Sequence, residues 1–458
     1  MTKIVSKNPS KNFQENGFIE SSSSDEISEK VNLAHQTKNK WANLEIKERI
    51  DSLKRVISTF EQKKDELALL ISKEMGMPIS QAFDDVNMGV SYFQWYFENA
   101  ERYLTSEITY EDGTSIHKVF YEPKGVVAVI IPWNFPFSNF VWQVGQNLIA
   151  GNTVILKHSE EVPLFAKEVE KIFNDSNLPK GVFNEVYGGA EVGNFLVNQD
   201  IDMICFTGST EVGKNLYRIS SEKFISILME LGGSAPGIVF EDADIDSVID
   251  SIYINKFLNC GQVCDGLKRL IVHESKFDEV VTKLKSILLS KKIGIAEAKD
   301  TEIGPLVSKK QLDRLKEQVQ DAIEKGATLV VGGKSPQNLL GAFFEPTILT
   351  NIKLDMKVWN EEVFGPVLPI ISFKTYEEAI KLANDTKYGL GGYVFTSNKE
   401  LYGMVIKDLK TGMMTQNNLS YVMPCNPFGG YKSSGIGREH GKYGFHEVCQ
   451  IKVVAMEK

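Results

Sequence analysis

The sequence lacks long apolar runs, an excess of basic residues and the cysteine density of a disulfide-bonded protein. Its longest apolar stretches, such as residues 126–131, are far shorter than the roughly 20 residues of a membrane-spanning helix. The net charge of −9 disfavours nucleic acid or an anionic membrane as a partner. Five cysteines and an N-terminus without a signal-like apolar segment fit a reducing compartment. We therefore expect a cytoplasmic protein, and we predict no metal site.

The 458 residues are too many for one typical core, so the length predicts two or more domains. Between residues 125 and 231, short apolar segments alternate with segments of helical pattern. The apolar segments are continuous, which is typical of parallel strands covered on both faces. The pattern predicts an α/β fold with a doubly wound parallel sheet, and a second α/β series follows it. Ligands bind such sheets beyond the carboxyl ends of the strands.

Residues 103–121 have a different character. β-favouring residues flank Asp112-Gly113, a dipeptide typical of hairpin turns. We expect a protruding arm that pairs with another subunit. Residues 449–458 resemble one more strand, and no partner for it lies nearby in the sequence. We therefore expect this C-terminal strand to pair with the hairpin of another subunit.

The run from Thr207 to Gly213, TGSTEVG, lies between a predicted strand and a predicted helix. Glycines there permit a tight turn and let a phosphate approach the helix N-terminus. The run is not the usual G-x-G-x-x-G fingerprint. GSTEVGKN has the spacing of a P-loop, but Asn215 stands where a P-loop has Ser or Thr for magnesium. A nucleotide-binding turn, a magnesium-dependent P-loop NTPase and a plain turn all remain open.

Polar residues also follow two other predicted strands. Lys157 and Glu160 have a spacing suited to the hydroxyls of an adenosine ribose, and a carboxylate there disfavours the 2′-phosphate of NADP. A solvated turn is the alternative interpretation. In PWNFP, prolines on both sides hold Asn134 rigidly. Its amide would be a good oxyanion donor, although a rigid turn with packed aromatic residues is the competing interpretation.

Cys264 and Glu230 are the candidate reactive pair. A thiol with its free pKa of about 8.5 is only a few per cent thiolate at neutral pH, so a nucleophilic cysteine needs activation. Glu230 ends an apolar run and is a plausible general base. Burial as a small hydrophobic residue is the commoner fate of a cysteine. A redox role for Cys260 and a cysteine hydrolase that pairs Cys264 with a histidine also remain open.

Seven motifs between Pro132 and Glu439 resemble, in order and approximate spacing, those of the aldehyde dehydrogenase superfamily. They are PWNFP, ILKHSE, FTGSTEVG, MELGG, NCGQVC, EEVFGPV and PFGGYKSSGIGRE. The resemblance implies NAD-dependent oxidation of an aldehyde to a carboxylic acid by a homodimer or homotetramer. It also implies three parts: a cofactor domain (1–104 and 122–231), a catalytic domain (232–424) and an oligomerisation arm (105–121 and 441–458), with 425–440 returning to the cofactor-domain side.

The resemblance assigns the catalytic roles. Cys264 matches the nucleophile, which forms a thiohemiacetal and then a thioester. Asn134 and the backbone N–H of Cys264 match the oxyanion hole. Glu230 matches the base that activates the hydrolytic water, and Glu439 matches a carboxylate associated with proton relay. An acylating enzyme that uses coenzyme A is a closer rival, but the matched Glu230 favours hydrolysis.

The resemblance also assigns the cofactor site. Lys157 and Glu160 match contacts to the adenosine ribose, and Ser209 matches a contact to the pyrophosphate. Glu362 and Phe364 match contacts to the nicotinamide ribose and ring. The expected site further includes Trp133, Gly208, Val212 and Gly232. NAD is favoured, and NADP is less favoured.

The chain length, GMPISQA and ILKH are similar to the short bacterial succinate-semialdehyde dehydrogenase branch. That branch has an arginine where this chain has Trp142, and related enzymes have another where this chain has Leu258. A buried substrate carboxylate without a cation is costly. Trp142, Phe135 and Phe428 instead resemble an aromatic substrate pocket. We therefore predict an uncharged aldehyde, with succinic semialdehyde as the alternative.

Overall fold

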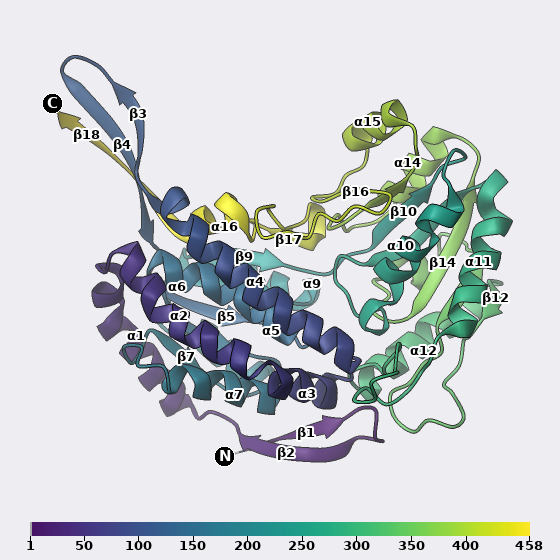
Figure 1. Ribbon diagram of the computed structural model, residues 1–458, viewed down its shortest axis with the longest axis horizontal. Helices are drawn as coiled ribbons and strands as arrows, with labels where there is room; N and C mark the ends of the chain where they lie inside the picture. The colour runs from purple at the N-terminus through teal and green to yellow at the C-terminus, as the bar shows by residue number, and fades with distance from the viewer. Residues whose placement is uncertain (1) are drawn as a thin grey trace.

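The computed structural model describes residues 2–458, which form two α/β domains and a projecting arm (Figure 1). The first domain contains a six-stranded sheet in which β9, β8, β5, β6 and β7 are parallel, and β17 pairs antiparallel to β9 at one edge. The strand order is β17 (Gly435–Ile436), β9 (Ser226–Glu230), β8 (Met203–Thr207), β5 (Val126–Ile130), β6 (Thr153–Lys157) and β7 (Phe183–Glu185).

Both faces of this sheet are covered, because alternate residues of β5 enter different cores. Val127 and Val129 pack in one core, and Val126 and Ala128 pack in the other. The first core contains residues of α2 (Ile46–Gln62), α3 (Lys64–Met75), α4 (Ile79–Leu104), α5 (Pro136–Phe140), α6 (Gln146–Ala150), α7 (Pro163–Asn174) and α16 (Gly441–Glu447). The second contains residues of α1 (Ser24–Ala42), α8 (Ala190–Val197) and α9 (Thr210–Lys223). This arrangement confirms the predicted doubly wound sheet.

The second domain has a seven-stranded sheet with an antiparallel pair at one edge. Its order is β12 (Thr328–Val331), β13 (Thr347–Thr350), β14 (Val367–Phe373), β11 (Leu267–His273), β10 (Ala235–Val239), β15 (Tyr393–Phe395) and β16 (Thr415–Gln416). Its helices are α10 (Ile245–Phe257), α11 (Phe277–Ser290), α12 (Lys309–Glu324), α13 (Lys357–Asn360), α14 (Tyr376–Asn384) and α15 (Lys399–Asp408). Sequence patterns missed β13 and β16, which are short.

The arm consists of β3 (Glu107–Glu111), β4 (Ser115–Pro123) and β18 (Cys449–Glu457). The predicted turn is present, and its Asp112 carboxylate accepts hydrogen bonds from the N–H groups of Thr114 and Ser115 at 2.8 Å each. Our expectation for the C-terminal strand was wrong. β18 pairs antiparallel with β4 of its own chain along its whole length. The preceding helix α16 packs on α4 and returns the chain to the base of the hairpin. The sequence does not indicate this pairing, because β18 and β4 are far apart along the chain.

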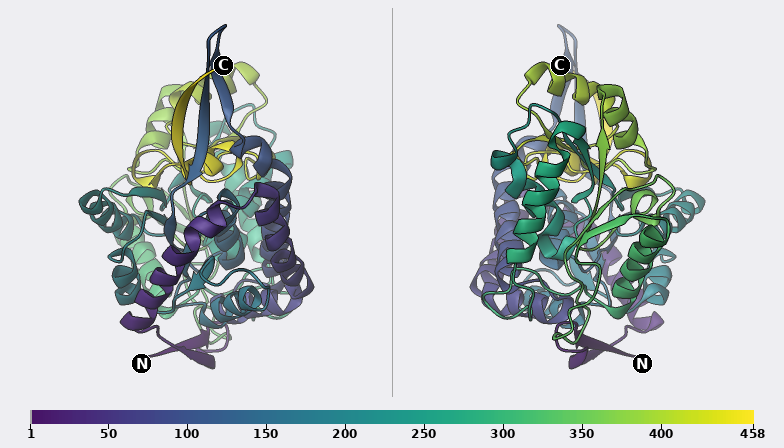
Figure 2. Two further views of the ribbon diagram at one scale, coloured as in Figure 1. Left: turned by 90° about the vertical axis from the view of Figure 1, so that its left-hand side faces the viewer. Right: turned by 90° about the vertical axis from the view of Figure 1, so that its right-hand side faces the viewer.

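A second hairpin, β1 (Lys3–Asn8) and β2 (Gln14–Glu20), was not predicted from the sequence. Figure 2 shows it at the opposite end of the molecule from the arm. It bridges the two domains. Asn16 donates to the carbonyl of Lys73 in α3 at 3.2 Å, and the N–H of Ala342 in the second domain donates to the carbonyl of Pro9 at 3.0 Å. None of the helices within residues 2–458 is long and apolar enough to cross a membrane.

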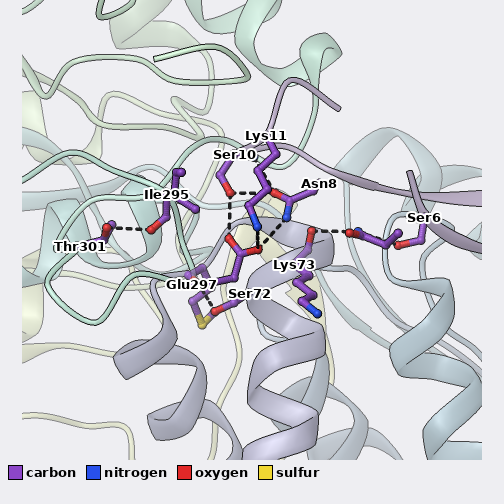
Figure 3. A network of polar contacts seen from close by, with 11 residues as sticks. Ser6, Asn8, Ser10, Lys11, Ser72, Lys73, Ile295, Glu297 and Thr301 are labelled. Carbon is purple, nitrogen blue, oxygen red and sulfur yellow. Dashed lines mark hydrogen bonds and ion pairs between the residues drawn. The ribbon is translucent and has the colours of Figure 1, made fainter. Parts of the chain in front are cut away.

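Glu297 is the centre of this bridge (Figure 3). Its carboxylate accepts from Asn8 at 2.9 Å and Ser10 at 3.2 Å, and Lys11 lies 3.0 Å from Oε1. Burial by itself would raise the pKa of Glu297, but hydrogen bonds from Lys11, its own backbone N–H and Asn8 outweigh burial and lower the pKa. The ionised carboxylate therefore stabilises the folded chain above the unfolded-state pKa of about 4.3, and this contribution is lost as the pH falls through the lower folded pKa.

We expect Glu297→Gln to lower the free energy of unfolding at pH 7 by about 1–2 kcal/mol, because three donors lose a charged acceptor. The difference from the wild type should shrink as the pH falls below about 4. Urea denaturation of both proteins at pH 7 and at pH 3 measures this difference in the free energy of unfolding. Glu20→Gln, an exposed change on the same hairpin, should lie within about 0.5 kcal/mol of the wild type. An equal loss for Glu297→Gln at pH 7 and pH 3 would contradict the assignment.

Candidate active site

The loop that carries Cys264 follows α10 and has an unusual backbone. Asn259, Cys260 and Gly261 have φ values of 49°, 55° and 74°. A left-handed conformation costs a non-glycine residue roughly 1–2 kcal/mol. Gly261 also lies close to the carbonyl of Gly365, which a Cβ at this position would approach to 2.2 Å. The loop therefore persists only because surrounding contacts hold it.

The main contacts join this loop to the PWNFP turn after β5. The side-chain amide of Asn259 donates to the backbone carbonyl of Asn134 at 2.7 Å. Asn134 reciprocates through Nδ2, which donates to the carbonyl of Gln262 at 3.0 Å. Asn139 lies 3.5 Å from Asn134 Oδ1 and fixes the orientation of the amide. An asparagine amide has two N–H donors, so one remains for a ligand.

Two cavities meet at Cys264 and Asn134, which line both. The larger, of about 240 Å³, we call the substrate cavity, and the smaller, of about 160 Å³, the cofactor cavity. A third cavity, of about 480 Å³, lies at the ends of β5 and β6. The three cavities bring together nearly all of the predicted site residues. Phe135, Trp142 and Phe428 line the first; Trp133, Gly208, Ser209, Glu230, Gly232, Glu362 and Phe364 line the second; Lys157, Glu160 and Val212 line the third.

Glu230 and Glu439 are brought together by the antiparallel pairing of β17 with β9, in which Gly435 lies opposite Glu230. Glu230 is 2% exposed, and within residues 2–458 neither of its carboxylate oxygens has a hydrogen-bond partner. Burial, and then the nearby Glu439, raise the pKa of Glu230 well above its usual range. Burial also raises the pKa of Glu439 to about 8. The two carboxyl groups titrate as a coupled pair that retains protons at neutral pH.

Gln143 supports this pair. Its side-chain amide donates to Glu439 and, at 2.9 Å, to the hydroxyl of Thr207. Gln143 and Trp142 belong to a π-helical turn, Val141–Gly145, that interrupts the helix between α5 and α6. The sequence predicts one continuous helix over 137–150. The π turn places Trp142 on the wall of the substrate cavity and Gln143 beside Glu439 and Thr207, and such turns are common at functional sites.

Cys264 is half-buried at the junction of the cavities. Burial, followed by the carboxylates of Asp265, Glu362 and Glu230, raises the pKa of its thiol well above the ordinary value, and Lys268 only partly opposes them. The ligand-free protein therefore holds Cys264 as a thiol at neutral pH.

The third cavity contains the predicted ribose contacts. Lys157 is buried, donates to the carbonyl of His158 at 3.1 Å and lies 3.5 Å from Glu160, whose side chain is 52% exposed. Ser209 caps α9 by accepting from the N–H of Val212 at 3.3 Å. The position of Lys214 argues against the P-loop interpretation. Lys214, its would-be phosphate ligand, is exposed and lines none of the three cavities.

The far wall of the cofactor cavity is formed by Glu362 and Phe364. Glu362 accepts from the N–H of Gly233 at 3.1 Å, and a Cβ on Gly232 would lie 2.4 Å from its carboxylate. The ring of Phe364 packs edge-on against Trp133 at 5.7 Å. Trp133, Gly232, Glu362 and Phe364 thus line the cofactor cavity together with Cys264.

The substrate cavity is mainly apolar, and aromatic side chains form part of its wall. The rings of Trp142 and Phe428 lie 5.9 Å apart, and Leu258 lines the wall near them. No lysine or arginine lines this cavity in the part of the chain that the structure describes. Its one charged lining residue is Asp265, which sequence patterns did not single out. Its position directly after the candidate nucleophile was the available signal.

The model of the aldehyde dehydrogenase family matches residues 2–454. The chain belongs to this family. It is 37% identical over 438 residues to the succinate-semialdehyde dehydrogenase, mitochondrial, of Oryza sativa subsp. japonica, with 94% of this chain and 82% of that protein covered. Membership confirms the resemblance that the motifs indicated and disfavours the NTPase and cysteine-hydrolase alternatives.

Two solved structures share the fold. Both have a TM-score of 0.96 at 33% identity and cover 100% of this chain. One is an NADP-dependent enzyme from E. coli, of which 95% is covered. The other is the NAD⁺ complex of an aldehyde dehydrogenase from Bacillus cereus, of which 93% is covered. The predicted fold class is confirmed.

Because the pKa of Cys264 is raised, we expect iodoacetamide to alkylate it slowly at pH 7 and rapidly only at a pH above the ordinary range of a thiol pKa. Peptide mass spectrometry across a pH series measures the rate at each cysteine. Cys425, which is exposed, should be labelled before Cys264 at pH 7. Preferential labelling of Cys264 at pH 7 in the ligand-free protein would contradict a thiol resting state.

Proposed function

We propose that this protein oxidises an aldehyde to a carboxylic acid with NAD, using Cys264 as the nucleophile. The observation that carries the proposal is the junction of the substrate and cofactor cavities at Cys264 and Asn134. A thiol at this junction faces a bound carbonyl on one side and an oxidant on the other. Membership of the aldehyde dehydrogenase family supports the same reaction.

The residues present fit NAD. Gly208 and the capping Ser209 open the N-terminus of α9 to a pyrophosphate, with Val212 beside it. Lys157 and Glu160 would hold the adenosine ribose. Bound NAD would supply the oxidant that takes two electrons from the aldehyde C–H bond. The residues that would hold its nicotinamide end are Trp133, Gly232, Glu362 and Phe364.

The chain's own groups perform the remaining chemistry. The sulfur of Cys264 bonds to the carbonyl carbon and forms a thiohemiacetal. The free N–H of the Asn134 amide and the backbone N–H of Cys264 stabilise the negative charge on oxygen, and one such donor contributes roughly 2.7–4 kcal/mol. Oxidation leaves a thioester on Cys264.

Glu230, once deprotonated, activates the water that hydrolyses this thioester. Its raised pKa suits a general base, because a carboxylate with an ordinary pKa is a weak proton acceptor. Glu439, linked to Gln143 and Thr207, is placed to relay the proton onward. A base on the cofactor side also favours hydrolysis over transfer to coenzyme A, so we expect NADH formation without coenzyme A.

The substrate we propose is an uncharged aldehyde. The cavity is mainly apolar, and the two positions at which related enzymes carry arginine are Trp142 and Leu258. A substrate carboxylate would lie unpaired near Asp265, which costs several kcal/mol. Similarity to a succinate-semialdehyde dehydrogenase keeps succinic semialdehyde as the alternative.

We also propose that the protein is a cytoplasmic homodimer or homotetramer that assembles through the arm. The arm's exposed apolar residues support this, because an uncovered apolar edge favours pairing. They are Ile108, Tyr110, Ile451 and Val453.

Cys264→Ala should reduce aldehyde-dependent NADH formation to background, because among residues 2–458 only Cys264 and Asn134 line both cavities and Asn134 is not a nucleophile. NAD affinity should stay within about threefold of the wild type, since the thiol is only one of many lining groups. Absorbance at the NADH band and calorimetric titration with NAD measure the two quantities. Retained turnover would rule out Cys264 as the nucleophile.

Glu160→Ser should relax the cofactor preference toward NADP, because the carboxylate that repels a 2′-phosphate is removed. We expect kcat/KM with NADP to rise at least about tenfold relative to NAD, equivalent to about 1.4 kcal/mol. Glu191→Ser, a change of another carboxylate in the same region, is the control. An unchanged ratio would show that Glu160 does not discriminate between the cofactors.

Kinetics with propanal, benzaldehyde and succinic semialdehyde will test the substrate class. The uncharged aldehydes should have the higher kcat/KM, and Trp142→Arg should raise kcat/KM for succinic semialdehyde at least about tenfold by supplying a cation. A wild-type preference for succinic semialdehyde would replace our substrate assignment with the alternative.

A further inference from the structure

Asp265 is a buried carboxylate beside Cys264. The reaction described above assigns no role to it. It is 8% exposed and lines the substrate cavity. Glu230 lines the cofactor cavity and does not reach the substrate cavity, whereas Asp265 lines the substrate cavity alone. The two carboxyl groups therefore lie on opposite sides of Cys264.

The two carboxylate oxygens and the backbone carbonyl of Asp265 each have a different hydrogen-bond partner. The thiol of Cys264 donates to Oδ1 at 3.8 Å. The hydroxyl of Tyr421 donates to Oδ2 at 2.9 Å. The hydroxyl of Tyr393 donates to the backbone carbonyl of Asp265 at 3.1 Å and lies 3.3 Å from that of Tyr421. Tyr421 thus holds the carboxylate and Tyr393 holds the backbone of Asp265, with one carboxylate oxygen facing the sulfur.

The surrounding charges leave Asp265 without a direct ion pair. Burial raises its pKa from the ordinary value, and the hydrogen bond from Tyr421 and the charge of Lys268 act in the opposite direction. Lys268 donates instead to the carbonyl of Gly261 at 3.2 Å. The titratable groups that face Asp265 from the elements around it are Tyr92, Glu230, Cys264, Lys268, Tyr393 and Tyr421. A buried carboxylate with a raised pKa is a better proton acceptor than an exposed one.

We propose that Asp265 accepts the proton of Cys264 when the sulfur bonds to the aldehyde. In this step the S–C bond forms and the S–H bond breaks, and the proton passes to Oδ1 of Asp265. The carbonyl electron pair moves to oxygen, where Asn134 donates to it. Glu230 then remains available to activate the hydrolytic water on the cofactor side. This inference rests on the proposed aldehyde oxidation with Cys264 as nucleophile.

The first experiment is rapid-mixing measurement of the NADH burst with propanal from pH 5 to 10. In the wild type, the burst rate should fall at acid pH as Asp265 becomes protonated. Asp265→Asn should slow the burst at pH 7 by at least about tenfold, because general bases typically contribute about 10²–10⁴-fold. In Asp265→Asn, the fall of the burst rate at acid pH should be replaced by a burst rate that rises with pH up to the pKa of the Cys264 thiol. Asp278→Asn, an exposed change on α11, is the matched control.

A second readout, taken with a variant that keeps the charge, separates this role from a structural one. Removing the negative charge of Asp265 lowers the pKa of Cys264, so Asp265→Asn should shift the pH midpoint of iodoacetamide alkylation downward while the burst becomes slower. Misfolding of the loop would also lower that midpoint, because it would expose Cys264, so a variant that keeps the charge separates the two roles. Tyr421→Phe keeps the charge and removes one donor to the carboxylate. It should therefore move the acid limb of the burst to higher pH.

The outcomes are distinct. A burst in Asp265→Asn within twofold of the wild type, with the same acid limb, would overturn the proposal. An unchanged pH midpoint of alkylation in Asp265→Asn would also overturn it, because the Asp265 carboxylate would then not interact with the Cys264 thiol. Absence of any aldehyde-dependent NADH from the wild type would instead refute the proposed function, while the alkylation midpoint would still report on the contact between Asp265 and Cys264.

Discussion

The reciprocal pair of hydrogen bonds between Asn134 and the 259–262 loop is the constraint on which the site depends. One bond runs from the Asn259 side chain to the Asn134 carbonyl, and the other from the Asn134 side chain to the Gln262 carbonyl. They join the cofactor-side turn to the strained loop of the nucleophile. Together with the N–H of Asn259, which donates to the Gln81 side chain at 2.8 Å, they hold Asn259 and Cys260 in a left-handed conformation that most residues avoid.

This constraint has a chemical consequence. The same amide that fixes the loop also lines both cavities, so in the proposed reaction one side chain would both position the sulfur and stabilise an oxyanion. The acidic groups are then distributed around the sulfur. Glu230 and Glu439 lie on the cofactor side, and Asp265 lies on the substrate side. Burial raises the pKa of each carboxyl group, which suits a site that moves protons at neutral pH.

Much of the first domain was predictable from the sequence, for a physical reason. Apolar runs that end in Asn134, Lys157 or Glu230 identify buried parallel strands, and such strands present their carboxyl ends at one edge. The motifs around them identified the family. The π turn that aims Trp142 and Gln143 was not predictable, because its residues have an ordinary helical pattern. Asp265 was also missed, since its position directly after Cys264 suggests no role until its contacts with Cys264 and Tyr421 are known.

The sequence by itself determined most of the alternating strands and helices of the two domains, the family and the residue types available for catalysis, because these depend on local patterns and spacing. Only the tertiary structure decided which of them meet. Pairing of β17 with β9 brings Glu439 to Glu230 across more than 200 residues of chain, and β18 finds its partner in its own hairpin. Contacts of this range depend on how distant apolar surfaces pack together, and no local pattern records that packing.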